Sequence, residues 1–224
     1  MNISSFIDHT ILKQSTILHE VDKVCDEALE YHFAAVCIPP VYVEYAAKKL
    51  AESTIKVATV IGFPFGYTYS SIKSAEAEKA IGEGAQEIDM VINVAALKNG
   101  DLLTLETEIK EVSGVVKNGN AILKVIIESG ILTPEEIITC CNIYSHFPVH
   151  FLKTSTGFAE KGASVEAVQL MRQHLPSSIQ IKASGGIRDY AFAKQLVDAG
   201  ATRLGCSASI AIVKGGLTND AGSY

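Results

Sequence analysis

Short apolar segments alternate with longer amphipathic segments along almost the whole chain, and this alternation limits the fold more than any other feature. The apolar segments have the length and composition of strands, and the stretches between them have helical periodicity. Strands that alternate with helices form a parallel sheet, and eight of them close into a (β/α)8 barrel of the TIM type. The predicted strands are 6–11, 34–38, 56–62, 87–93, 121–128, 150–155, 179–183 and 202–206, and the predicted helices include 16–31, 41–52, 70–83, 102–117, 134–145, 164–175 and 189–198.

The length of the chain and its even composition favour one barrel domain. A chain of 224 residues falls in the usual range for a single α/β barrel. An open doubly wound sheet is the alternative, but no GxGxxG turn follows the first predicted strand. We therefore predict one barrel domain over residues 1–214. The polar, glycine-rich segment 215–224 is predicted to be a flexible tail.

Charge and cysteine content limit the possible partners. The formal net charge is −6 and no basic cluster is present, which argues against a nucleic-acid surface. The five cysteines form no CxxC pair, so we expect neither a disulfide framework nor a zinc site. The N-terminal segment lacks the apolar core of a signal peptide, and no apolar run reaches the length of a membrane span. The sequence predicts a soluble cytoplasmic protein that needs no metal or other cofactor.

Two lysines interrupt apolar strand-like segments that end in small polar residues. Lys153 lies in HFLKTSTG and Lys182 lies in IQIKASGG. Burial disfavours the ammonium form, so such a lysine has a lowered pKa and a nucleophilic amine. Reacting groups of α/β barrels lie at the carboxyl ends of the strands. This pattern indicates amine chemistry on a carbonyl compound.

Further ionisable residues lie within or at the ends of the predicted strands. The alternative to catalysis is a buried network of structural ion pairs, but a scaffold rarely needs so many desolvated ions. Because neighbouring ammonium groups disfavour each other, one lysine near Asp89 should be largely neutral at pH 7 and able to form a Schiff base. Asp89 is then placed to relay protons through a water. The residues of this set are Asp8, Asp89, Lys124, Glu128, Lys153 and Lys182.

Small residues at the ends of the last two predicted strands suggest a phosphate site. Gly185 and Gly186 follow the seventh strand, and Ser207 follows the eighth. Backbone N–H groups of such turns bind phosphate, and phosphate sites are frequent at this position in α/β barrels. The alternative for each motif alone is an ordinary turn.

The chain resembles the deoxyribose-phosphate aldolase family through almost its whole length, from Asp8 to Ser207. The resemblance lies in IDHTIL, AAVCIPP, ATVIGFPFG, EIDMVINVAAL, LKVIIESG, FLKTSTGF, KASGGIR and RLGCSAS, in this order. It implies a class I aldolase that reversibly cleaves 2-deoxy-D-ribose 5-phosphate into D-glyceraldehyde 3-phosphate and acetaldehyde. It also implies that Lys153 forms the Schiff base, that Asp89 and Lys182 relay protons and modify the pKa, and that Gly157, Gly185, Gly186 and Ser207 contact phosphate.

Two positions depart from relatives of this kind. Some relatives carry a lysine where this chain has Phe158, and a second serine where it has Ala208. We therefore predict a weaker hold on the substrate phosphate than in a lysine-bearing relative.

Several other residues have two possible roles in this interpretation. Asp8 and Lys124 are predicted to bind substrate, although Asp8 alone suits a loop contact equally well. Cys37 is more typical of an inert core thiol than of a site residue. A role for the terminal Tyr224 is the minority hypothesis.

Other functions remain open on the residues alone. The lysine pair also suits another Schiff-base phosphosugar aldolase, a transaldolase-like enzyme or an isomerase on the same barrel. A non-catalytic phosphate-binding barrel with structural lysines is the third alternative. The expected partner is a small phosphosugar, and helix faces rich in alanine and valine permit a homodimer without requiring it.

Overall fold

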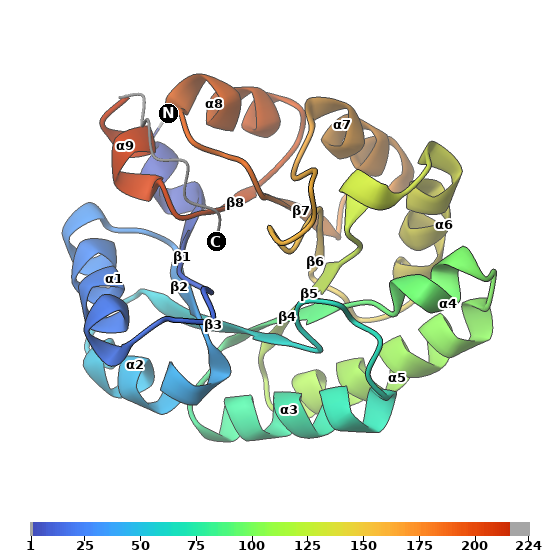
Figure 1. Cartoon of the computed structure of the whole chain (residues 1–224), viewed down its shortest axis with the longest axis horizontal. Helices are drawn as coiled ribbons and strands as arrows, with labels where there is room; N and C mark the ends of the chain where they lie inside the picture. The colour runs from blue at the N-terminus through green and yellow to red at the C-terminus, as the bar shows by residue number, and fades with distance from the viewer. Residues whose placement is uncertain (1, 216–224) are drawn as a thin grey trace.

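Eight parallel strands close into a barrel in the computed structural model, which describes residues 2–215 (Figure 1). Each strand pairs with the next one along the chain, and β8 pairs with β1, so the barrel has no open edge. This confirms the (β/α)8 barrel and excludes the open sheet. The strands are β1 Ile7–Thr10, β2 Ala35–Ile38, β3 Lys56–Ile61, β4 Glu87–Val91, β5 Ile122–Ile126, β6 Phe151–Lys153, β7 Gln180–Ser184 and β8 Arg203–Cys206.

The helices form a ring around the barrel (Figure 1). The α-helices are α1 Leu18–Tyr31, α2 Val43–Lys49, α3 Ser70–Gly82, α4 Val94–Lys98, α5 Leu102–Asn118, α6 Pro134–Tyr144, α7 Val165–His174, α8 Tyr190–Asp198 and α9 Ser209–Val213, and the 3₁₀ turns are η1 Ile3–Phe6, η2 Pro40–Tyr42 and η3 Ser129–Ile131. None of the helices between residues 2 and 215 is both long and apolar enough to cross a membrane.

Helix boundaries follow from local chemistry, and this also explains the main departures from prediction. Thr133 caps α6, where its hydroxyl accepts from the N–H of Glu136 at 3.3 Å. The second predicted helix, 41–52, is shorter because Pro40 begins a 3₁₀ turn before α2 starts. The short helices α4 and α9 were not predicted, since five residues carry little periodic signal.

The barrel interior has an apolar half and an ionic half. Alternate residues of each strand face inward, and register partners on neighbouring strands share a face. Strands β2 and β3 contribute a small apolar cluster to the interior that contains Ala35, Cys37, Ala58 and Val60. The inward positions of β4 to β8 carry most of the charged residues, and Asp8 of β1 completes them. The ionic half contains the three residues that the sequence singled out for catalysis, Asp89, Lys153 and Lys182.

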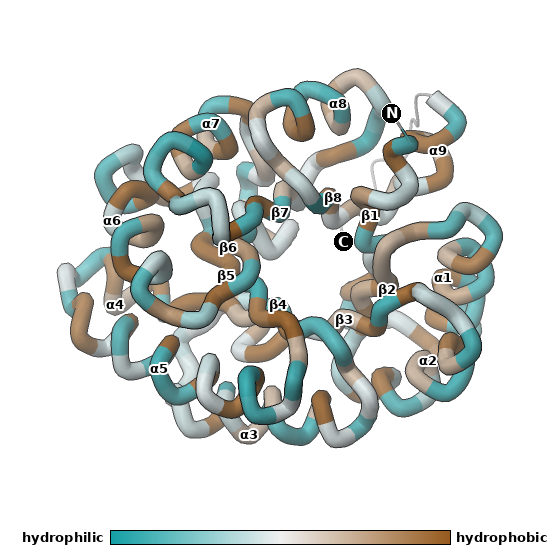
Figure 2. The backbone as a smooth tube through the Cα atoms, turned by 180° about the vertical axis from the view of Figure 1, so that it is seen from behind, coloured by the Kyte–Doolittle hydropathy of each residue, from teal (hydrophilic) through white to brown (hydrophobic). Residues whose placement is uncertain are grey.

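The other face of each strand packs against the helices in a large apolar core. Val36, Ile38, Ile88 and Met90 are fully buried in this core. Figure 2 shows hydrophobic and hydrophilic positions alternating along the surrounding helices, as expected for helices with one face on a sheet. The predicted tail 215–224 lies outside the described residues from 216 onward, and so does Tyr224.

Candidate active site

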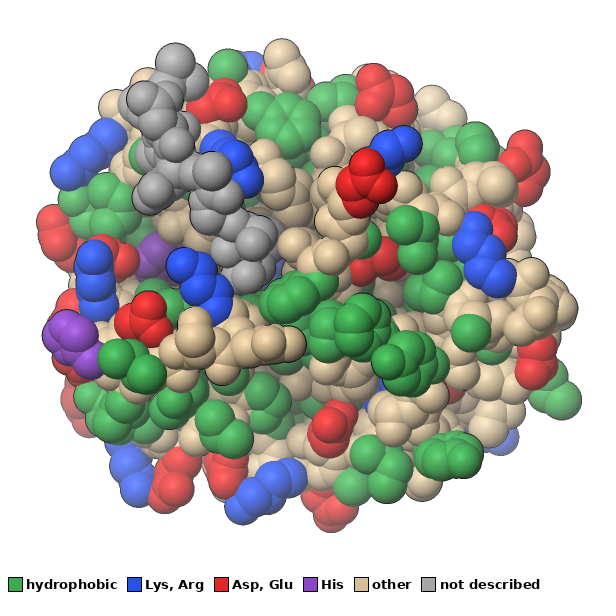
Figure 3. Space-filling view, viewed as in Figure 1, with side chains coloured by type: hydrophobic (Ala, Val, Ile, Leu, Met, Phe, Trp, Pro, Cys, Tyr) green, Lys and Arg blue, Asp and Glu red, His purple; other side chains and the backbone are tan. Residues whose placement is uncertain are grey.

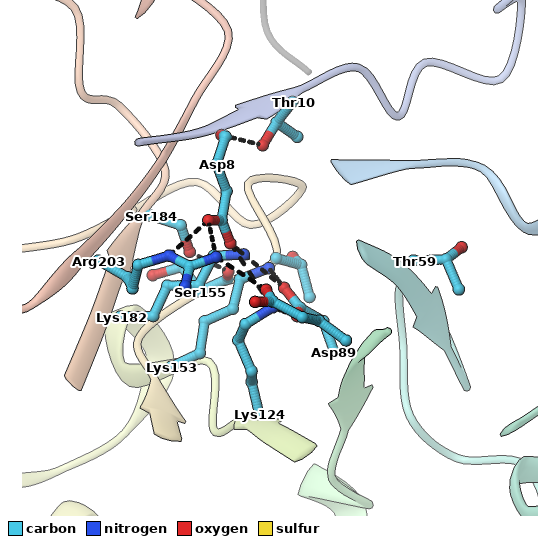
Figure 4. Close-up of polar contacts among 12 residues, drawn as sticks. Asp8, Thr10, Thr59, Asp89, Lys124, Lys153, Ser155, Lys182, Ser184 and Arg203 are labelled. Carbon is cyan, nitrogen blue, oxygen red and sulfur yellow. Dashed lines mark hydrogen bonds and ion pairs between the residues drawn. The ribbon is translucent and has the colours of Figure 1, made fainter. Parts of the chain in front are cut away.

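Two lysines on neighbouring strands donate to the same carboxylate oxygen (Figure 4). Lys153 ends β6, and its register partner on β7 is Lys182. The Nζ atoms of Lys153 and Lys182 lie 2.8 and 2.7 Å from Oδ2 of Asp89. Asp89 reaches them from β4, across the barrel interior. The structure therefore brings together the three residues that the sequence singled out for catalysis.

Lys124 and Asp8 complete this arrangement, Lys124 from β5 and Asp8 from β1. Lys124 on β5 donates to Oδ1 of Asp89 at 2.7 Å, so both oxygens of that carboxylate are occupied. Asp8 on β1 lies 2.5 Å from Nζ of Lys182. Both side chains are fully buried. The structure therefore gives Asp8 and Lys124 partners within the protein, and their predicted contact with substrate stays a prediction.

Two further charged residues belong to this network of buried ion pairs, and the sequence analysis did not identify them. Arg203, at the start of β8, donates through Nε to Asp8 at 2.7 Å and lies 2.8 Å from Glu87 through Nη2. Glu87 also accepts from Lys124 at 2.6 Å. The signal for Glu87 was its position two residues before Asp89, which puts both on one face of the strand. Arg203 gave no such signal, because it stands near the start of the predicted strand 202–206.

The pKa values of the three lysines differ in direction. Burial lowers the pKa of Lys153, and the nearby Lys182 cation lowers it further, against the pull of Asp89. Burial acts on Lys182 in the same sense, but the carboxylates of Asp8 and Asp89 outweigh it and hold its pKa well above the ordinary value. The pKa of Lys124 is also raised against burial, chiefly by Asp89 and Glu87. Lys153 is the lysine of this set with the most accessible neutral form.

Solvent exposure points to the same residue. Lys153 keeps 2% of its surface exposed, whereas Lys124 and Lys182 have none. Although burial favours protonation of Asp89, the three lysines outweigh it and keep its pKa well below the ordinary range. The site therefore combines a lysine with a lowered pKa, a lysine with a raised pKa and a carboxylate with a lowered pKa.

Hydrogen bonds tie the ends of β6 and β7 together beside the lysines. The hydroxyl of Thr154 donates to the carbonyl of Ser184 at 3.1 Å, and the Ser184 N–H donates back to it at 3.0 Å. The Ser184 hydroxyl donates to the Ser155 carbonyl at 2.6 Å. These bonds hold the two lysine-bearing strands together at their carboxyl ends.

The four predicted phosphate contacts lie on one rim of the barrel. Gly157 follows β6, Gly185 and Gly186 follow β7, and Ser207 follows β8, and these strands are neighbours. Gly185 has φ 87°, and a Cβ there would lie 2.9 Å from the Cα of Gly162. Only glycine fits such a position. Gly186 and Ser207 are exposed on this rim, whereas Gly185 is buried, and the phosphate contact of all four residues stays a prediction.

The helix after this rim offers little to an anion. The carboxylate of Asp189 caps α8 and accepts from the N–H of Phe192 at 2.9 Å. A negative charge already occupies the positive end of the helix dipole. The backbone of the Gly185–Gly186 turn, rather than the helix end, is thus the better candidate for binding phosphate.

The two departures noted in the sequence have different surroundings. Phe158 is 38% exposed and packs edge-to-face on Phe63 of the β3–α3 loop, with ring centroids 5.3 Å apart. Ala208 is the residue before α9.

Phe63 lines a cavity of about 310 Å³, and Phe158 lines one of about 220 Å³. The aromatic pair therefore lies between two hollows. Figure 3 shows hydrophobic side chains gathered near the centre of the viewed face.

Cys37 faces the apolar half of the barrel and is fully buried. Burial raises the pKa of its thiol, which keeps it protonated and unreactive. Among residues 2–215, no group of three or more His, Cys, Asp or Glu side chains is arranged to hold a metal ion.

Comparison with known proteins agrees with this geometry. The family model described as DeoC/LacD family aldolase matches residues 3–215. The chain belongs to the DeoC/LacD aldolase family. A deoxyribose-phosphate aldolase of Streptococcus pneumoniae (strain Taiwan19F-14) is 47% identical over 219 residues, which cover 98% of this chain and 99% of the relative. One from Lactococcus lactis subsp. cremoris (strain SK11) is 48% identical over 220 residues, with 98% and 99% covered.

Solved structures place this DeoC/LacD family member in the same fold. An aldolase named QR15 has a TM-score of 0.89 at 36% identity, with 95% of this chain and 94% of that chain covered. The tetrameric deoxyribose phosphate aldolase of Aeropyrum pernix has a TM-score of 0.88 at 27% identity, with 95% and 89% covered. The barrel fold and the aldolase family thus rest on both sequence and structure.

Proposed function

We propose that this aldolase reversibly cleaves 2-deoxy-D-ribose 5-phosphate into D-glyceraldehyde 3-phosphate and acetaldehyde through a Schiff base on Lys153. The observation that carries the proposal is the unequal lysine pair. Lys153 has a lowered pKa and some exposure, while its partner Lys182 is held as a cation by two carboxylates. The names of the 47–48% identical relatives support this substrate.

The proposed reaction begins with attack of the neutral Lys153 amine on C1 of the open-chain aldehyde. Loss of water from the carbinolamine gives an iminium ion, which withdraws electrons from C2. Removal of the proton from the C3 hydroxyl then breaks the C2–C3 bond. D-Glyceraldehyde 3-phosphate leaves, and an enamine of acetaldehyde remains on Lys153. Protonation at C2 and addition of water release acetaldehyde and restore the amine.

Asp89 and Lys182 serve this sequence in different ways. The ionised Asp89 carboxylate is a proton acceptor in hydrogen-bond reach of Lys153. It relays protons between the substrate and solvent through a water. Lys182 stays protonated, lowers the pKa of Lys153 and supplies a proton donor beside it. Gly157, Gly185, Gly186 and Ser207 are proposed to bind the phosphate with backbone N–H groups and a hydroxyl.

The second candidate function is that of another Schiff-base phosphosugar aldolase or a transaldolase-like enzyme, because these use the same amine chemistry.

The proposed partner is a small phosphosugar, and the proposed location is the cytoplasm, which suits the five free cysteines of the described chain. A homodimer stays a prediction. The Aeropyrum pernix relative is described as tetrameric.

Borohydride reduction tests the proposal directly. The protein is incubated with acetaldehyde and sodium borohydride, digested, and its peptides are mapped by mass spectrometry. We expect an ethyl group on Lys153, and no adduct on that peptide in the Lys153→Met variant. Adducts that form only with ketose phosphates would support the second candidate function. Absence of any adduct on Lys153 would overturn the Schiff-base mechanism.

A further inference from the structure

Glu128 is a buried carboxylate that the proposed reaction does not use. It follows β5 and is 6% exposed. Its backbone has φ 57° and ψ 54°, the left-handed region that a glutamate rarely adopts. Such a conformation persists only where the surroundings stabilise it, and it is typical of functional sites.

The Glu128 side chain holds the segment that follows the reactive lysine. The N–H of Thr156 donates to the two carboxylate oxygens at 3.2 and 3.3 Å. The Thr156 hydroxyl also donates to Oε2, and it accepts in turn from the N–H of Phe158 at 3.0 Å. One carboxylate therefore fixes residues 156–158, which include Gly157.

The backbone around Glu128 extends the pairing of β5 with β6 beyond both strands. Ile127 N–H donates to the carbonyl of Lys153 at 3.0 Å, and Ser129 N–H donates to the carbonyl of Thr154 at 2.7 Å. Glu128 lies between these two bonds and is directed at the same strand end. Its left-handed backbone thus lets the side chain and both neighbours bind one segment.

Unlike the other buried carboxylates of the barrel, Glu128 has no cationic side chain as an ion-pair partner among residues 2–215. Asp8, Glu87 and Asp89 each form ion pairs, whereas no ion pair within 4 Å involves Glu128 among residues 2–215. Burial raises its pKa, and the Thr156 hydrogen bonds and the more distant Lys153 act against this. A structural ion pair therefore does not explain the position of this carboxylate, whereas its bonds to Thr156 do.

We propose that Glu128 is a positioning residue that fixes the segment Thr156–Phe158 on the rim, so that Gly157 is placed to receive the substrate phosphate. The phosphate part of this inference rests on the proposed function. The hold on the segment does not, because it follows from the hydrogen bonds alone. Glu128 and Thr156 act as one unit in this proposal.

Three variants separate the effect of the Glu128–Thr156 hydrogen bonds from an effect on overall stability. Glu128→Gln keeps the shape of the side chain but leaves one acceptor oxygen for two donors, the N–H and the hydroxyl of Thr156. Thr156→Val removes the hydroxyl, and Thr156→Ser keeps it. The matched control is Glu106→Gln, an exposed glutamate on α5. Urea unfolding of each variant confirms that the comparison is made on folded protein.

The first measurement is amide hydrogen exchange of the peptide that contains residues 154–158. We expect faster exchange in Glu128→Gln and Thr156→Val by about tenfold, the effect of losing one hydrogen bond to a charged group. Exchange in Thr156→Ser and Glu106→Gln should match the parent protein. Unchanged exchange in Glu128→Gln would overturn the hold, whatever the activity of the protein.

The second measurement is the ratio of kcat/KM for 2-deoxyribose 5-phosphate to kcat/KM for 2-deoxyribose. We expect this ratio to fall about tenfold in Glu128→Gln and in Thr156→Val, with no further fall in the double variant. A merely structural role would lower both values by the same factor, and that result would overturn the phosphate part. If borohydride traps no adduct on Lys153 of the parent protein, the proposed function is refuted instead. The exchange measurement would still decide whether Glu128 fixes residues 156–158.

Discussion

Lys153 and Lys182 are register partners on adjacent strands, and both donate to Oδ2 of Asp89. Their surroundings nevertheless differ, because Lys182 has a second carboxylate, Asp8, at 2.5 Å. Lys153 has no such second partner among the ion pairs of residues 2–215. The difference of one carboxylate therefore separates a lysine whose pKa is raised from one whose pKa is lowered.

Replacing Lys182 by methionine should raise the pKa of Lys153. The substitution removes a neighbouring cation, and it also frees Asp89 to stabilise the Lys153 ammonium. Less neutral amine is then present at pH 7, so the rising limb of the pH profile of kcat/KM should move to higher pH, by about one unit or more. Activity at pH 7 should fall by about 100-fold, the usual range for loss of an acid–base group. The control is Lys194→Met on the surface, and an unmoved limb would contradict this role of Lys182.

Asp89→Asn should destabilise the protein strongly. Three buried lysines share this carboxylate, and its loss leaves their charges poorly balanced. Breaking a buried ion pair by removing one partner costs about 3–5 kcal/mol. Urea unfolding should therefore show a lower midpoint than in the parent protein. Asp198→Asn, which breaks an exposed pair with Lys194, should change the free energy of unfolding by less than about 1 kcal/mol.

The stabilising effect of Asp8 should depend on pH in a defined direction. The cations Arg203 and Lys182 outweigh burial and hold the pKa of Asp8 below its ordinary value of 3.8. A carboxyl with a lowered pKa stabilises the folded state above the ordinary pKa, and this stabilisation is lost as the pH falls through the folded value. The difference in unfolding free energy between the parent protein and Asp8→Asn should thus be constant from pH 5 to pH 7. It should shrink once the pH falls below about 4, the pKa of an ordinary Asp. A difference that grows on acidification would contradict this assignment.

Phe158→Lys should strengthen phosphate binding. Position 158 follows Gly157 on the rim, and the present ring offers no charge to an anion. We expect a lower KM for 2-deoxyribose 5-phosphate with little change in kcat, and no gain for 2-deoxyribose. The loss of the edge-to-face contact with Phe63 should cost about 1 kcal/mol of stability. Phe65→Lys, in the same cavity wall, is the matched control, and an equal gain there would show a general charge effect.

The barrel and the three central residues could be predicted from the sequence because both leave strong local signals. An alternation of strands and helices is visible without contacts, and a lysine within an apolar segment is conspicuous. Arg203 and Glu87 were harder to find, because each lies at a strand start where charge is usual. Their roles depend on the closure of the barrel, which places Arg203 beside Asp8.

The left-handed backbone of Glu128 could not be predicted either. Nothing in LKVIIESG signals such a conformation, because glycine or asparagine usually marks it. The predicted helix 189–198 included Asp189, and its role as the cap of α8 appears only once the helix start is known. Local chemistry could thus be predicted where one segment determines it, and not where distant segments meet.

The pairing of β1 with β8 has a consequence for the synthesis of the chain. Asp8 emerges from the ribosome 195 residues before Arg203. The ionic half of the barrel therefore cannot assemble until the whole segment between these two residues is available for folding. We expect nascent or truncated chains that lack β8 to contain Lys153 without its final surroundings. The lowered pKa of Lys153 should therefore appear only once β8 has closed the barrel.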